Sequence, residues 1–165
     1  MEEEVFQVHH RHVILTIDEG LRVVFLKHRE LLKVFMDEGA RLVKEYFEKK
    51  HKVTPGIIVG LHTFGSKMNF NPHLHMLVTM GGMKNNGEWK TYDFIPFEML
   101  RKQWQTIVLK LIRRMLSEEE KKKIQPLLQK VLCQWRRLLC VCPKTKREHQ
   151  GAIGVYWPFV TVKYL

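Results

Sequence analysis

The spacing of hydrophobic residues along the chain switches between two periods, one typical of strands and one typical of helices. The segment 5–17 (VFQVHHRHVILTI) is rich in β-branched residues and predicts a first strand. The apolar run 57–64 (IIVGLHTF) predicts a second strand, and the segment 72–80 predicts a third, which the glycine pair 81–82 closes. Consecutive strands joined by a short loop often pair as a hairpin, and another short strand is expected at 88–94.

Three other segments carry apolar residues at helical spacing. Residues 28–50 and 96–116 each place apolar side chains on one face with Lys, Arg and Glu between them. Ser117 followed by Glu120 forms a capping box, which predicts a third helix that continues through Val131. The expected fold is therefore α+β, with an antiparallel sheet of about four strands and helices packed on one face.

The local signals agree with one another only up to about residue 130. Beyond Val131 the composition becomes rich in Cys and Arg, Pro143 interrupts it, and residues 144–149 are charged without any period. We therefore expect one core domain at 1–130, followed by a tail at 131–165 that is aberrant, poorly ordered or non-native.

The chain of 165 residues is strongly basic, with a formal net charge of +11. A compact domain with this excess favours a polyanionic partner, most often nucleic acid, although solubility alone explains part of the charge. The first residues are acidic, and no apolar run approaches the length that spans a bilayer. We expect a cytoplasmic protein without a membrane partner.

Basic side chains gather on the polar side of the segment 96–116. They form a plausible track for backbone phosphates, and a solvated surface explains them nearly as well. The expected DNA-binding residues are Arg101, Lys102, Lys110, Arg113 and Arg114, together with Lys67 in the loop before the third strand.

Two histidines flank a leucine in the third strand. Successive side chains of a strand point to opposite faces, so His73 and His75 share one face while Leu74 lies on the other. The pair can direct two imidazoles at one ion, but half-buried structural histidines are about equally expected from this spacing alone. A histidine-triad hydrolase is disfavoured because Leu77 occupies the position of the third histidine.

The leading candidate for a third ligand is His62. It precedes the pair by one strand, and a hairpin would place it beside His73 and His75. His10 and His12 share a face of the first strand and would approach the pair if the strands were neighbours. For these two we favour exposed or core-capping roles.

The cysteines all fall late in the chain and do not indicate a disulfide framework. Cys133, Cys140 and Cys142 are odd in number, and they lack the paired two-residue spacings of a zinc site. Unligated thiols are favoured over a metal site that would include His149.

The segment 60–82 (GLHTFGSKMNFNPHLHMLVTMGG), with HRHVILTI upstream and a basic helix downstream, resembles the core of the two-tyrosine HUH transposases of rolling-circle-type insertion sequences. The resemblance covers roughly residues 11–129. Its Phe-Gly-Ser and Asn-x-Asn-Pro-His-x-His combination is far more specific than the histidine pair.

The resemblance implies a HUH-endonuclease-like fold and a DNA transposase that cleaves and transfers single strands. It implies that His73 and His75 hold a divalent cation, Mn²⁺ or Mg²⁺, with a third polar ligand such as His62. In such enzymes a tyrosine attacks phosphorus and forms a phosphotyrosine while the cation polarises the phosphate. The implied partner is single-stranded DNA at transposon ends.

The tail lacks the tyrosine motif that the resemblance calls for, and the family's cysteine-rich zinc-binding segment is not found before the first strand. Residues 134–159 can be encoded by codons that, read one base later, give NGEGFYVYAPKQKGNIKEQLGYIGR, which looks like the missing continuation. We therefore expect a shifted reading frame and no catalytic tyrosine, with Tyr164 a very weak candidate. The alternative function is a non-catalytic nucleic-acid-binding module with structural histidines.

Overall fold

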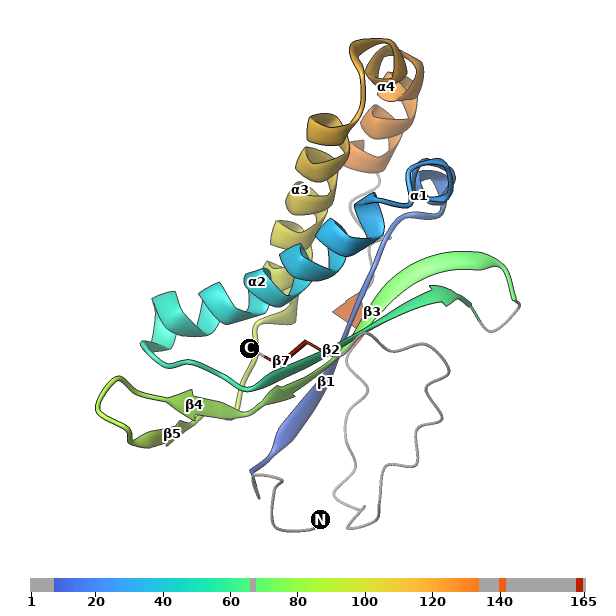
Figure 1. The fold of residues 1–165 in the computed structure, drawn as a ribbon. Coiled ribbons are helices and arrows are strands. Elements are labelled where there is room, and N and C mark those ends of the chain that lie inside the picture. The colour runs from blue at the N-terminus through green and yellow to red at the C-terminus, as the bar shows by residue number, and fades with distance from the viewer. Residues whose placement is uncertain (1–7, 66–67, 134–139, 142–162, 165) are drawn as a thin grey trace.

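The centre of the protein is an antiparallel sheet whose long strands are β1 (His10–Thr16), β2 (Ile57–Phe64) and β3 (Phe70–Thr79) (Figure 1). The computed structural model describes residues 8–65, 68–133, 140–141 and 163–164. β3 lies between β1 and β2. Two-residue strands, β6 (Cys140–Val141) and β7 (Lys163–Tyr164), extend the outer edges in the order β6-β1-β3-β2-β7.

Strands β2 and β3 form the hairpin that their short connection predicts. The ladder runs from Ile57 opposite Val78 to His62 opposite His73. Between His62 and Phe64 the register shifts, so that Phe64 lies opposite Phe70. The strict alternation of faces therefore holds up to His62 and is interrupted at the end of the hairpin.

The helices pack on one face of the sheet, which confirms the expected α+β architecture (Figure 1). They are α1 (Arg22–Lys27), α2 (Leu31–His51), α3 (Phe97–Met115) and α4 (Glu118–Cys133), with a short 3₁₀ turn at Glu19–Leu21 before α1. The pattern of apolar residues predicted α2, α3 and α4. It did not predict α1, whose six residues are too few to show a helical period.

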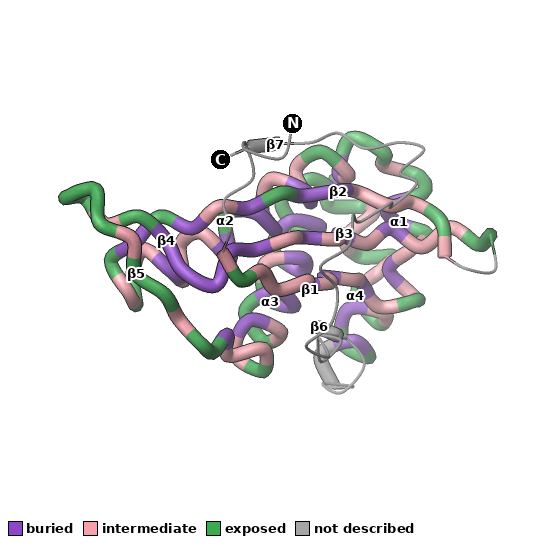
Figure 2. The backbone as a smooth tube through the Cα atoms, turned by 90° about the horizontal axis from the view of Figure 1, so that it is seen from below, coloured by how far each residue is buried: buried purple, intermediate pink, exposed green. Residues whose placement is uncertain are grey.

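The two faces of the sheet differ in burial. Leu74, Met76 and Val78 of β3 are fully buried against the helices, whereas the residues between them are only partly buried. Figure 2 shows this alternation of buried and intermediate positions along β3. We call the side that faces away from the helices the histidine face. Its residues are His10, His12, Ile14 and Thr16 of β1, Ile58, Gly60 and His62 of β2, and His73, His75 and Leu77 of β3.

The strand that carries the histidine pair is held directly against α2. The side chain of Leu74 occupies the space that a Cβ atom on Gly39 would need, and Trp104 of α3 closes over the same contact. The indole Nε1 of Trp104 donates a hydrogen bond of 2.9 Å to the carbonyl oxygen of Thr16 in β1. Helix packing thus positions β1 and β3 relative to each other.

The expected strand at 88–94 does not join the main sheet. It is reduced to β5 (Trp89–Thr91), which pairs with β4 (Gly81–Met83) in a separate two-stranded sheet. The glycine pair follows the end of β3, as expected, and also begins β4. A Cβ on Gly81 would lie 2.6 Å from the carbonyl oxygen of Lys90, so the close approach of the two backbones requires glycine there.

The capping box at the start of α4 forms as predicted. The Glu120 carboxylate accepts hydrogen bonds from the Ser117 backbone N–H at 3.0 Å and from its hydroxyl at 2.9 Å, and the Ser117 hydroxyl accepts one from the Glu120 N–H at 3.4 Å. No helix in the described part of the chain is long and apolar enough to cross a membrane.

Candidate metal centre

Three histidines from the β2–β3 hairpin converge on the histidine face. His62 lies directly opposite His73 in the ladder, and His75 follows two residues later on the same face. One potential ligand atom from each residue lies within 4.8 Å of the others. The hairpin thus brings together the three residues that the sequence predicts as metal ligands.

The three rings lie close enough to surround one ion. The centroid of His62 is 4.4 Å from that of His75 and 5.4 Å from that of His73, and the centroids of His73 and His75 are 4.9 Å apart. Gly60 lies opposite His75 in the ladder. Because Gly60 has no side chain, the ring of its neighbour His62, which is diagonal to His75, can approach the His75 ring.

The orientation of His73 is set by its own strand. Its Nδ1 lies 2.6 Å from the carbonyl oxygen of Asn71. Because a carbonyl oxygen only accepts hydrogen bonds, Nδ1 carries the proton, and the lone pair of the neutral ring is on Nε2. A backbone carbonyl that fixes the tautomer in this way is typical of histidines that bind metals.

A fourth histidine, His12, joins the cluster from β1. Its Nε2 lies 2.8 Å from Nδ1 of His75, and the two rings stack with centroids 5.0 Å apart and an angle of 23° between their planes. The expectation that His12 is exposed or caps the core was therefore wrong. β1 pairs with β3, which places His12 opposite Leu77 and diagonal to His75. No local sequence signal identifies this contact, since the two residues are 63 positions apart.

Burial and crowding favour the neutral forms of His12, His62 and His75. Burial, aided by the neighbouring imidazoles of His62, His73 and His12, lowers the pKa of His75 from 6.5 to about 4. Burial also lowers the pKa of His62, with help from His73 and His12, and burial alone lowers the pKa of His12. Neutral imidazoles are the form that binds metal ions, so these rings need not lose a proton near pH 7 to do so.

The basic residues expected to bind DNA lie elsewhere. Five of them belong to α3, which packs on the face of the sheet opposite to the histidine face (Figure 1): Arg101, Lys102, Lys110, Arg113 and Arg114. Lys67 lies outside the described residues. The structure thus does not bring the five basic residues of α3 together with the histidines.

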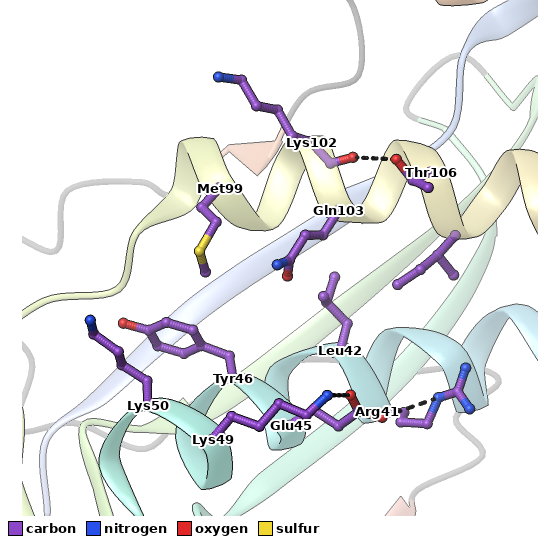
Figure 3. Close-up of a pocket in the computed structure, with 11 residues that line it drawn as sticks. Arg41, Leu42, Glu45, Tyr46, Lys49, Lys50, Met99, Lys102, Gln103 and Thr106 are labelled. Carbon is purple, nitrogen blue, oxygen red and sulfur yellow. Dashed lines mark hydrogen bonds and ion pairs between the residues drawn. The ribbon is translucent and has the colours of Figure 1, made fainter.

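A cavity of about 660 Å³ opens between α2 and α3 (Figure 3). Leu42 and Tyr46 of α2 and Met99 of α3 form its apolar wall. Three of the four basic side chains that line it are paired with acids. Lys49 contacts Glu45 at 2.5 Å, Lys102 contacts Glu98 at 3.3 Å, and Arg41 contacts Glu38 and Glu45.

The tyrosines with described side chains do not reach the cluster. Tyr46 belongs to α2 and Tyr92 follows β5, and both pack around His51 on the helix side. Tyr164 of β7 has its backbone opposite Ile58 of β2, four positions before His62. Most of the predicted tail lies outside the described residues, as do Cys142 and His149.

Comparisons with known proteins agree with the sequence motif. A family model described as "Putative transposase" matches residues 56–145, more than half of the chain. The transposase for insertion sequence element IS801 of Pseudomonas savastanoi pv. phaseolicola is 34% identical over 133 residues, which cover 78% of this chain and 31% of that protein. The chain thus spans about a third of the length of this curated relative. No solved structure was found to match.

The matched region includes the whole β2–β3 hairpin with its three histidines and continues through α3 and α4. Together with the α+β sheet that carries the histidine motif on its central strand, these matches show that the chain belongs to the two-tyrosine transposase family of rolling-circle-type insertion sequences.

Proposed function

We propose that the chain holds a divalent cation with His62, His73 and His75 and binds single-stranded DNA across the histidine face. The observation that carries this proposal is the convergence of three imidazoles from paired strands, with ligand atoms within 4.8 Å of one another. Family membership supports DNA as the partner, and the net charge of +11 favours a polyanion.

The donor set fits a transition-metal ion better than Mg²⁺. Imidazole nitrogens bind Mn²⁺ and, more strongly, the later first-row metal ions, whereas Mg²⁺ prefers carboxylates, water and phosphate oxygens. Burial lowers the pKa values of His62 and His75, which favours the neutral forms of these two rings, and the tautomer of His73 is set by the Asn71 carbonyl. Of the two ions that the family resemblance implies, we propose that Mn²⁺ binds more tightly than Mg²⁺, which is accepted when water and phosphate complete the site.

The residues of the chain would act by positioning one phosphate of the strand. The histidine rings occupy a β-ladder whose backbone is rigid, so the cation and any phosphate bound to it are held at a fixed place on the sheet. A bound cation would withdraw electron density from the phosphate and stabilise the charge that develops when phosphorus is attacked.

The nucleophile is the part of the family's chemistry that we propose is missing. Tyr46 and Tyr92 lie in the helix layer, and the sequence shows no tyrosine motif like that of the family. We therefore propose that this chain binds the cation and the DNA strand without forming a phosphotyrosine.

Two measurements on the full chain test the proposal. Titration of Mn²⁺, followed by the electron paramagnetic resonance of the free ion, is expected to show one site, which the double variant His73→Ala, His75→Ala loses. His9→Ala is the matched control, since His9 is an exposed histidine just before β1. Incubation with single-stranded hairpin DNA and Mn²⁺ is expected to leave no adduct after denaturation, and an adduct would refute the missing nucleophile.

The alternative is a nucleic-acid-binding module in which the histidines are structural, which the basic composition also favours. It predicts DNA binding that weakens with salt but is indifferent to a chelator and to the double histidine variant. Fluorescence anisotropy of labelled single strands, with and without Mn²⁺, separates the two functions. Binding that Mn²⁺ strengthens supports the metal centre.

A further inference from the structure

The two rings of the His-x-His pair use the same nitrogen to contact the protein. Nδ1 of His73 contacts the Asn71 carbonyl oxygen at 2.6 Å, and Nδ1 of His75 contacts Nε2 of His12 at 2.8 Å. For His73 the proton position follows from the acceptor. For His75 the contact has two possible directions, because either imidazole can donate.

The two directions have opposite consequences for metal binding. If Nδ1 of His75 donates, its lone pair is on Nε2, as it is in His73, and both rings present the same atom to an ion. If Nε2 of His12 donates, Nε2 of His75 carries a proton and cannot coordinate. The function of the pair therefore depends on which ring accepts.

We propose that His12 is a positioning residue whose Nε2 accepts the hydrogen bond from Nδ1 of His75, so that Nε2 of His75 is the nitrogen that coordinates the cation. This inference rests on the metal-binding function proposed above and adds to it. In this inference His12 fixes the tautomer of His75, just as the Asn71 carbonyl fixes the tautomer of His73.

Three features of the structure support this role. β1 and β3 pair over seven consecutive residues, so the place of His12 beside His75 is fixed by the ladder. The rings are also stacked at 23°, which limits rotation of the His75 ring. Trp104 anchors the end of the same strand through its bond to the Thr16 carbonyl. Substitution of a residue that hydrogen-bonds the second ring nitrogen of a histidine ligand typically lowers metal affinity by about 10–100-fold.

The first test reads the tautomer directly in the metal-free full chain. The two ring nitrogens of His75 are distinguished by ¹⁵N NMR of histidine-labelled protein, with His75→Gln used to assign the signals. We expect the proton on Nδ1 in the wild type. A proton on Nε2 would overturn the inference, even if the chain binds Mn²⁺.

The second test compares variants of His12. His12→Gln keeps an oxygen that can accept from Nδ1, whereas His12→Leu keeps a side chain of similar size that cannot. We expect Mn²⁺ affinity to fall by about 10–100-fold in His12→Leu and to stay within a few-fold of the wild type in His12→Gln. His10→Leu is the matched control, since His10 lies on the same strand and the same face.

The outcomes separate the two proposals. Equal losses in His12→Gln and His12→Leu would contradict a positioning role and identify His12 as a fourth ligand. Wild-type protein that binds no Mn²⁺ would refute the metal-binding function, while the NMR measurement would still determine the tautomer of His75. Thermal unfolding of each variant excludes loss of the fold as the cause of weaker binding.

Discussion

His62 lies directly opposite His73 in the antiparallel ladder of β2 and β3, and their ring centroids are 5.4 Å apart. Because the pairing is made by the backbone, substitution of one side chain removes a single imidazole and leaves the register in place. The proposed metal centre can therefore be examined one ligand at a time.

Removal of His62 is expected to weaken Mn²⁺ binding more than removal of a residue that only orients a ligand. We expect His62→Ala to lose more than about 100-fold in affinity, which exceeds the usual effect of an orienting partner. Isothermal titration calorimetry measures this loss, with His9→Ala as the control. An affinity equal to that of the wild type would exclude His62 as a ligand.

Stability is expected to fall as the pH is lowered from about 6.5 to about 4. The pKa of His75 is about 4 in the folded chain, below its ordinary value of 6.5, so the unfolded chain binds the proton first in this range. The pKa values of His62 and His12 are also lowered in the folded chain, so their protonation likewise reduces stability as the pH falls. Because His75 is only partly buried, and solvent therefore screens the effect, we expect it to account for a loss of about 1–2 kcal/mol in the free energy of unfolding.

Urea unfolding of the metal-free protein at several pH values measures this dependence. His75→Leu is the comparison, because it removes the titrating group, and its stability is expected to change less between pH 6.5 and pH 4. If the free energy of unfolding changes equally with pH in the wild type and in His75→Leu, then the pKa of His75 is not lowered in the folded chain as its surroundings indicate.

The bond from Trp104 to Thr16 is expected to contribute to the stability of the whole domain. Trp104→Phe removes the donor of a 2.9 Å hydrogen bond from a side chain that is 2% exposed, and the Thr16 carbonyl loses a partner. We expect a loss of about 1–3 kcal/mol in the free energy of unfolding, measured in urea. Thr106→Ala removes a hydroxyl from the exposed side of the same helix, and we expect it to change stability by less than about 0.5 kcal/mol.

The basic end of α3 lies away from the histidine face, so we expect it to contribute to DNA binding where the strand continues past the edge of the sheet, without affecting the cation. Arg113→Ala with Arg114→Ala removes two exposed charges from the helix layer, on the opposite side of the sheet from the histidines. We expect unchanged Mn²⁺ affinity and a salt dependence of single-strand binding that is shallower by about 0.7 for each phosphate that no longer pairs with an arginine. An unchanged salt dependence would show that the strand does not reach α3.

Local chemistry was enough to predict most of the elements. The bounds of β2 at Ile57 and Phe64, the shared face of His73 and His75, and the capping box at Ser117 all agree with expectation. Each depends on residues only a few positions apart, through strand alternation, turn signals or helix capping. The β2–β3 hairpin could also be predicted from the sequence, because its strands are consecutive and their connection is short.

The contacts between distant segments were decided by the tertiary structure. His12 meets His75 only because β1 pairs with β3, and β1 takes that place because its inner residues, Val13 and Leu15, are buried with Leu74 beneath the helices. The same packing leaves α3 and its arginines in the helix layer. The sequence by itself determined the long strands and the three long helices, because the spacing of their apolar residues is a local property. Only the packing of the core determined which strands became neighbours and which histidine lies beside His75.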